Sequence, residues 1–295
     1  MNFDDFVNWS AENIRDFLPQ SYCDARVIVN KVEKLGHSYT GMCVMPEGEN
    51  IAATVDLDMF YREHLAGAGS RELLEKMAGM VQYKHPEADF EWIADYGKVR
   101  DRLFIRVCGI MENRELLLYV PHKNLADLSI TYHILMDVHD GCIGSAMITD
   151  DMLESYNISE EQLHSDALKS SSRILPAKVL PLADILGEER LPGWNLLAVT
   201  NENRINGASA LFYPDIMEMV AGIVGGSYYV LPSSVHEMLV LRDDGEQDVG
   251  RLEDIVRHIN RMDVVPRDDF LSDTVYYYDA AKHAFGLARE MQRCN

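Results

Sequence analysis

The chain has 295 residues, of which 47% are hydrophobic, so it can bury a substantial core in one large or two ordinary domains. Its 48 acidic and 27 basic residues leave a formal net charge of −21, which disfavours direct binding to nucleic acid or to an anionic membrane. No stretch has the pattern of a signal peptide, and the five cysteines form no CxxC pair. We therefore expect a cytoplasmic protein that does not span a membrane.

Residues 1–190 are predicted to form an N-terminal α+β portion. Phe3, Phe6 and Val7 begin an apolar pattern at helical spacing, so an amphipathic helix should open the chain and end at Pro19. Three strands separated by turn-forming residues should follow as an antiparallel meander. They are expected at 26–32, 39–45 and 51–60.

The third of these strands alternates apolar and polar residues, which places Thr54, Asp56 and Asp58 on one face. Two neighbouring carboxylates suit a divalent cation or an acid–base pair. With no identifiable third ligand, we favour ordinary solvent-facing side chains, and the sequence predicts no metal site.

Further along this portion, helices and strands alternate with a later hairpin. We predict a helix that follows Gly69-Ser70 and turns its apolar residues between 73 and 81 inward, and a second helix at 96–107. Strands are expected at 116–120 and 129–138, with a turn at Asp140-Gly141 into a strand at 142–148.

The strongest local signal of this portion is a helix start at Ser159. Ser159 with Gln162 forms a capping box, and Ile158 with Leu163 forms a hydrophobic staple. Proline and glycine punctuate the chain after this helix, most clearly at Leu191-Pro-Gly193, which indicates a domain boundary after residue 190.

Residues 191–295 are predicted to form a ββαββα portion, with helices packed on one face of an antiparallel sheet. In the first unit, strands 196–199 and 208–212 flank an Asn206-Gly207 turn and precede a helix at 215–224. In the second, strands 228–231 and 238–241 precede a helix at 248–262. Pro232 should take the chain out of the sheet between these strands, and a last strand is expected at 273–278.

The turn between the second pair of strands gathers the residues best suited to chemistry. It contains Ser233, Ser234, His236 and Glu237, whereas the preceding loop supplies Asn201, Arg204 and Asn206. Nucleophilic catalysis needs a hydroxyl held against a base that a third group orients, and adjacency in sequence does not supply that geometry. The alternative is a turn whose side chains cap exposed backbone groups. We therefore treat these seven residues as a candidate ligand or partner site and assign no catalytic residue.

Motifs for metals and cofactors are missing. His236-Glu237 begins an HExxH pattern, but Val240 stands where the second histidine is needed. No GxGxxG, GxxxxGK[ST] or GxSxG occurs, so the sequence predicts no cofactor.

Several segments resemble one family, the bacterial domain-of-unknown-function family 5688. They are Val120-Pro-His122 with Asp127-Leu128, Val199-Thr-Asn201 with Asn206-Gly-Ala208, Tyr229-Val-Leu-Pro-Ser-Ser-Val-His-Glu237, and Leu271-Ser-Asp273 with Val275-Tyr-Tyr-Tyr278. The resemblance covers most of the chain in the same order. It implies a coherent fold and a bacterial, cytoplasmic protein with an accessory or defence-related role, and it implies no activity.

Two hypotheses about function follow, with a third behind them. The first is a non-catalytic binding or regulatory protein with an unknown protein or small-molecule partner. The second is a hydrolase-like enzyme that uses the Ser233–Glu237 turn. The third is a nucleic-acid mimic, which rests on acidity alone.

Overall fold

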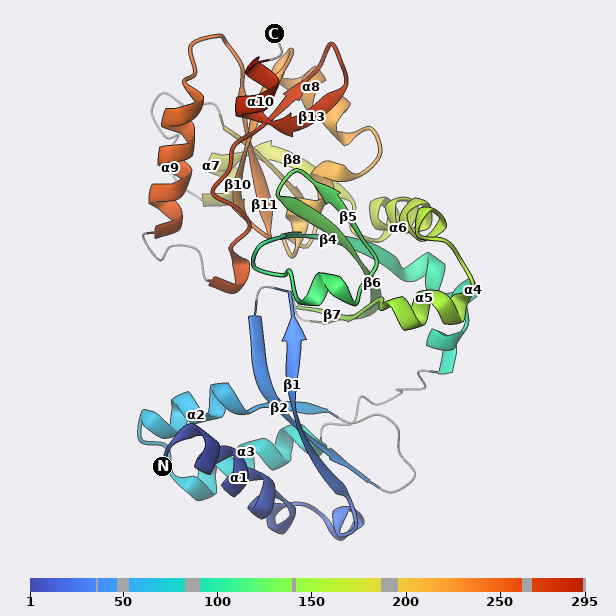
Figure 1. The fold of residues 1–295 in the computed structure, drawn as a ribbon, viewed down its shortest axis with the longest axis vertical. Coiled ribbons are helices and arrows are strands. Elements are labelled where there is room, and N and C mark those ends of the chain that lie inside the picture. The colour runs from blue at the N-terminus through green and yellow to red at the C-terminus, as the bar shows by residue number, and fades with distance from the viewer. Residues whose placement is uncertain are drawn as a thin grey trace. The chain divides into compact units, whose positions relative to one another are not determined.

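The computed structural model describes residues 1–35, 37–46, 53–82, 91–139, 142–186, 196–261 and 267–293. They belong to two compact units, residues 1–90 and 91–295 (Figure 1). Helices and antiparallel sheets occur in both, which confirms the α+β class. The division expected after residue 190 does not coincide with this split, because strands on either side of that position pair in one sheet.

The N-terminal unit is a small antiparallel sheet with helices and one core. The sheet has the order β1-β2-β3, as the meander prediction required. Phe6, Val44, Leu57 and Met77 are among the fully buried members of the core. The elements are α1 (Phe3–Asn13), η1 (Ile14–Phe17), η2 (Gln20–Tyr22), β1 (Arg26–Lys34), β2 (His37–Met45), β3 (Thr54–Asp56), α2 (Leu57–Leu65) and α3 (Ser70–Gln82), where η marks a 3-10 helix.

The prediction of a strand through residue 60 is wrong, because α2 begins at Leu57. The Asp56 carboxylate accepts a hydrogen bond of 2.9 Å from the backbone N–H of Met59 and so caps the helix. Asp58 accepts one of 2.6 Å from the backbone N–H of Thr40 on β2. These two carboxylates therefore accept hydrogen bonds from backbone N–H groups, one on α2 and one on β2.

The C-terminal unit contains two antiparallel sheets. In the smaller sheet the long strand β6 pairs with β4 along one edge and with β5 and then β7 along the other. The larger sheet has the order β13-β12-β10-β11-β9-β8. The strands are β4 (Leu103–Gly109), β5 (His122–Leu125), β6 (Leu128–His139), β7 (Cys142–Met147), β8 (Ala177–Pro181), β9 (Leu197–Asn201), β10 (Tyr228–Ser234), β11 (Glu237–Arg242), β12 (Tyr276–Asp279) and β13 (Ala284–Leu287).

Helices connect these strands. The α-helices are α4 (Tyr96–Val99), α5 (Asp150–Tyr156), α6 (Glu160–Ile174), α7 (Leu182–Leu186), α8 (Ile216–Val224), α9 (Val249–Arg261) and α10 (Ala288–Arg293), and the 3-10 helices are η3 (Glu91–Ala94), η4 (Arg100–Arg102), η5 (Leu116–Leu118), η6 (Gly207–Phe212) and η7 (Arg267–Asp269). Among the helices of the described ranges, none is both long and apolar enough to cross a membrane.

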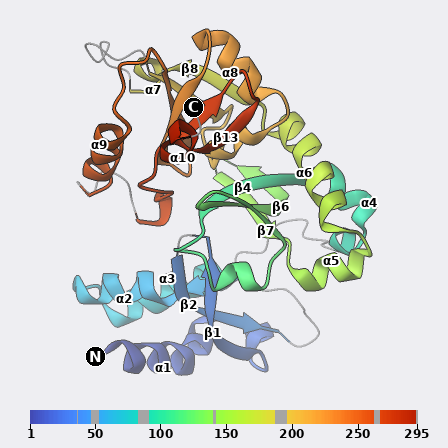
Figure 2. The ribbon, with the colours of Figure 1, turned by 45° about the horizontal axis from the view of Figure 1, so that its top comes forward.

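Both faces of the six-stranded sheet are covered, rather than one face as predicted. Tyr228 and Val230 of β10 belong to the main core, which also contains Val220 of α8. Tyr229 and Leu231 of the same strand face the other way, into a second cluster with residues of α9. Figures 1 and 2 accordingly show α8 and α9 on opposite sides of this sheet.

Two predictions in the first part of this unit are wrong. Residues 96–107 were expected to form one helix, but α4 and η4 are short and β4 begins at Leu103. Phe104 and Ile105 are both buried although they point to opposite faces, so this strand lacks the alternation that would have revealed it. Residues 116–118 form a 3-10 helix instead of a strand, and Leu118 is exposed.

The ββαββα repeat also needs correction, because residues 207–212 form η6 instead of a strand. β9 is already paired with β11 on one edge and with β8 on the other, so no edge remains for this segment. The second strand pair is present, but β10 continues past Pro232 to Ser234. β12 pairs only with residues 228–230 of β10, so Pro232 lies beyond that ladder, where its missing N–H costs nothing.

Candidate functional site

Three segments of the C-terminal unit meet at the turn between β10 and β11. The backbone N–H of Val235 in this turn donates to the carbonyl of Asp269 in η7, at 2.9 Å. The carbonyl of Val235 accepts from the N–H of Ala208 in η6, at 3.1 Å. We call residues 201–209 and 233–237, together with Asp269, the polar corner.

Asn201 folds the first loop of the polar corner. This buried side chain accepts hydrogen bonds from the N–H groups of Asn203 and Ile205, and its amide donates 2.8 Å to the carbonyl of Ile205. The loop places Arg204 and Asn206 in the left-handed backbone region, at φ 55° and 52°. Asn201 therefore has a structural role, since its polar atoms close the loop on itself.

Gly207 allows the loop to approach the turn. A Cβ atom at this position would lie 2.6 Å from the carbonyl oxygen of His236 and 2.7 Å from the backbone nitrogen of Asn201, and it would also collide with the hydroxyl of Thr200. That hydroxyl donates to the same His236 carbonyl at 2.8 Å. Only glycine fits where these backbones meet.

The imidazole of His236 has a partner at each nitrogen. Nδ1 accepts a hydrogen bond of 3.2 Å from the backbone N–H of Asn206, so the proton of the neutral ring is on Nε2. Nε2 lies 3.3 Å from a carboxylate oxygen of Asp269. The two side chains are about one-third exposed, at 33% and 30%. The ring thus joins all three segments of the polar corner.

The serine and glutamate of the turn form a separate small network. The hydroxyl of Ser234 donates to the carboxylate of Glu237 at 3.1 Å and accepts from the N–H of His236 at 3.0 Å. Within the described residues, neither Ser233 nor Ser234 is hydrogen-bonded to the imidazole. The geometry does not provide the hydroxyl–base pair that nucleophilic catalysis needs.

Three of the seven predicted residues keep their side chains available. Arg204 is exposed, and its guanidinium makes no hydrogen bond or ion pair within the described part of the chain. The Ser233 hydroxyl and the Asn206 side-chain amide, on partly buried residues, likewise have no partner there. The polar corner is therefore a fixed backbone framework that carries a guanidinium, an amide and a hydroxyl without partners among the described residues.

Sequence reasoning missed Asp269, the carboxylate that faces His236. It lies 33 residues further along the chain, in the last turn of η7, and no motif links the two positions. Only the fold brings them together, so no local signal was available.

A second polar cluster, centred on Asp127, joins the two sheets. One oxygen of Asp127 accepts from the hydroxyls of Ser272 and Thr274 at 2.8 and 2.9 Å, and the other from Tyr276 at 2.6 Å. Burial is the main cause that raises the pKa of Tyr276, and the charge of Asp127 adds to it. Tyr276 therefore stays protonated and donates, which gives this cluster a structural role.

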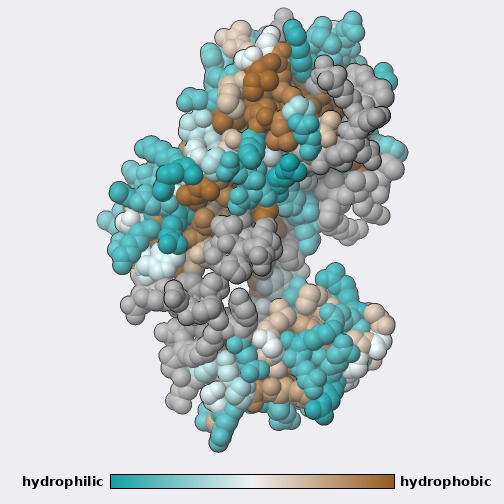
Figure 3. Space-filling view, turned by 180° about the vertical axis from the view of Figure 1, so that it is seen from behind, coloured by the Kyte–Doolittle hydropathy of each residue, from teal (hydrophilic) through white to brown (hydrophobic). Residues whose placement is uncertain are grey.

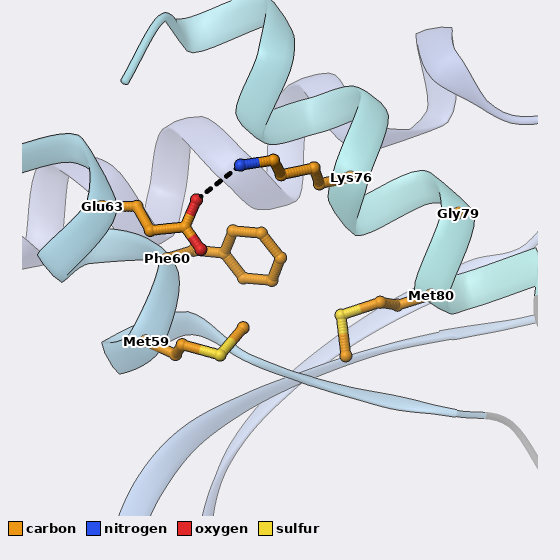
Figure 4. A pocket seen from close by; sticks show the side chains of 6 residues that line it. All are labelled: Met59, Phe60, Glu63, Lys76, Gly79 and Met80. Carbon is orange, nitrogen blue, oxygen red and sulfur yellow. Dashed lines mark hydrogen bonds and ion pairs between the residues drawn. The ribbon is translucent and has the colours of Figure 1, made fainter. Parts of the chain in front are cut away.

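The N-terminal unit has a shallow hollow of about 460 Å³ between α2 and α3. Figure 4 shows Met59, Phe60 and Met80 around it, with Glu63 and Lys76 joined by a 2.9 Å ion pair. Met59 and Met80 are 36% and 41% exposed. The hollow offers soft apolar side chains, while its two charges neutralise each other.

The fold and the polar corner define the class of protein: an α+β protein of antiparallel sheets in which hydrogen bonds tie the β10–β11 turn to two neighbouring segments. The chain belongs to a family of unknown function, DUF5688, whose model matches residues 3–280. The match confirms the resemblance drawn from the motifs. No curated protein and no solved structure matches the chain.

Proposed function

We propose that the protein is a non-catalytic binding or regulatory protein and that its partner binds at the polar corner. The observation that supports this is the engagement of both imidazole nitrogens of His236, by Asn206 and by Asp269. A general base needs a free lone pair near the proton that it removes. In neutral His236 this lone pair is on Nδ1, where it already accepts the hydrogen bond from Asn206.

The chemistry of the available groups favours a partner with an acidic group. Arg204 offers a planar set of donors that matches a carboxylate or a phosphate, and the Ser233 hydroxyl lies on the neighbouring segment. The corner is rigid because its hydrogen bonds fix both loops, so a partner would lose little free energy in ordering them. Arginine is also a frequent energetic centre of protein interfaces.

The competing hypothesis is a hydrolase-like enzyme at Ser233–Glu237. It needs a serine hydroxyl against the imidazole, whereas Ser234 donates to Glu237 instead. Hydrolysis of a panel of p-nitrophenyl esters that disappears in the His236→Gln variant would establish the enzyme and exclude our proposal.

The direct test is site-specific crosslinking in cells of the source organism. A photoreactive amino acid at Ser233 is expected to give a discrete crosslinked product. Arg204→Ala should reduce its yield by about tenfold or more, because a charge-assisted contact contributes roughly 1.5–3 kcal/mol. The same photoreactive group at Asp254 on α9, which is 77% exposed, serves as the control. Products of equal yield at both positions, or none at Ser233, would contradict the proposal.

A further inference from the structure

A second pocket in the C-terminal unit has a different chemistry from the polar corner. It has a volume of about 220 Å³ and lies between β5, β6, α6 and the η6–α8 segment. This volume is smaller than that of most ligand pockets, so any occupant must be a small molecule. It shares no residue with the polar corner.

Its lining combines an apolar surface with three side chains that carry a charge or an imidazole. Leu125, Leu211 and Met217 supply apolar surface, and Lys123, His164 and Glu218 supply the polar groups. A largely apolar pocket with a few convergent polar groups is the usual form of a small-molecule site.

Among the described residues, Lys123 is a cation without an anionic partner. Its Nζ lies 3.4 Å from Nε2 of His164, and among the described residues it has no carboxylate within ion-pair distance. A lysine ammonium only donates, so Nε2 of His164 accepts and Nδ1 carries the proton toward the Tyr132 hydroxyl, 3.0 Å away. Burial and the charge of Lys123 both lower the pKa of His164, so the ring is neutral beside this cation. The Lys123 ammonium retains donors for another acceptor.

Glu218 supplies a fixed negative charge elsewhere in the pocket. One carboxylate oxygen accepts 2.9 Å from the Tyr278 hydroxyl and lies 3.3 Å from Nδ1 of His283. Hydrogen bonding from its own backbone N–H, and then from Tyr278, lowers the pKa of Glu218. A ligand with a second negative charge would therefore be repelled.

We propose that this pocket binds a small monocarboxylate with an apolar body, its carboxylate paired with Lys123 and its body against Leu125, Leu211 and Met217. The Lys123 ammonium supplies the complementary charge, and His164 holds that ammonium in place. Glu218 selects against dicarboxylates. The proposal does not depend on what the polar corner binds.

The test is calorimetric titration of the full chain with 3-phenylpropionate, hexanoate and isovalerate, with 3-phenylpropanamide as the uncharged comparison. At least one acid is expected to bind with a Kd below about 5 mM and at least tenfold more tightly than the amide, since a charge-assisted hydrogen bond contributes more than one factor of ten. Imidazole signals of His164 and methyl signals of Met217 should shift together in NMR spectra.

Matched variants locate the site. Lys123→Met keeps the apolar stem and is expected to weaken binding about tenfold, whereas Lys123→Arg should retain it. Lys169→Met removes an exposed lysine of α6 that does not line the pocket, and it should leave the Kd unchanged. Thermal melts check that each variant is folded. Absence of saturable binding by all three acids, equal affinity for the amide, or an unchanged Kd in Lys123→Met would each overturn the proposal.

Discussion

Some polar side chains of the C-terminal unit are buried within its sheets, and His133 is the clearest example. It is 2% exposed on β6, its Nε2 lies 3.0 Å from the Thr131 hydroxyl, and its ring lies 5.4 Å from that of Phe104. Burial is the main cause that lowers its pKa well below 6.5, and the charge of Arg106 adds to it. The folded protein therefore holds a neutral imidazole.

This lowered pKa makes stability depend on pH. Below pH 6.5 the unfolded chain binds a proton at His133 and the folded chain does not, so the free energy of unfolding falls as the pH falls, by about 1.4 kcal/mol per unit. His133→Gln removes this titrating group. The free energy of unfolding, measured with urea, should therefore fall less steeply between pH 6.5 and 5. His258→Gln, at an exposed site on α9, should keep the wild-type slope. An unchanged slope in His133→Gln would show that the ring is protonated in the folded state.

The elements that the sequence predicted best are helices whose N-terminus has a capping residue. α6 begins after Ser159, whose hydroxyl accepts from the N–H of Gln162 at 3.2 Å, as the capping box required. α9 begins after Asp248, which accepts from the N–H of Arg251 at 2.7 Å. The Gln162 side chain departs from the prediction, because it donates to Asp166 instead of returning to the helix start.

The elements that were missed depend on their neighbours. The segment at 208–212 has the composition of a strand, but both edges of β9 are already occupied. β4 is buried on both faces, so its pattern resembles that of a buried helix. The polar corner was predicted only in part. Seven of its residues, Arg204 among them, were named from local sequence, whereas Asp269 is adjacent to them only in the folded chain.

Alanine substitutions at two glycines give a matched test of the contact between the loop and the turn of the polar corner. Gly207→Ala is expected to destabilise the protein by about 2–4 kcal/mol, because the new methyl group meets backbone atoms that cannot move without breaking the corner. Gly222→Ala on α8 should stabilise it by about 0.5–1 kcal/mol, since nothing lies within 4 Å and alanine favours the helix. Chemical denaturation measures both values. Similar effects of the two substitutions would show that the loop and the turn are not in close contact.

The molecule as a whole consists of two units with separate cores. The apolar cluster of the first unit draws its buried members from residues 6–81, and the two clusters of the second unit draw theirs from residues 99–288. Each of these clusters therefore takes its buried members from one unit. α8 leaves Met219 and Ile223 exposed at 44% and 55%, and Figure 3 shows apolar surface on one face of the C-terminal unit.

Separate cores predict that residues 91–295 fold alone. This fragment should unfold cooperatively within a few degrees of the matching transition of the full chain, followed by near-ultraviolet circular dichroism. A fragment of residues 191–295 lacks β8 and the four-stranded sheet, so it should not fold, because half of the main core is missing. A cooperative transition in the shorter fragment would restore the boundary after residue 190.

The position of β10 in its sheet has a consequence for synthesis of the protein. β10 lies between β11 and β12, and its Tyr228 and Tyr229 pair with Tyr278 and Tyr277 near the end of the chain. Asp127 likewise finds its hydroxyl partners only 145 to 149 residues later. A nascent chain cannot complete either arrangement until β12 has left the ribosome, so this unit should finish folding late in its synthesis and expose aromatic surface to chaperones until then.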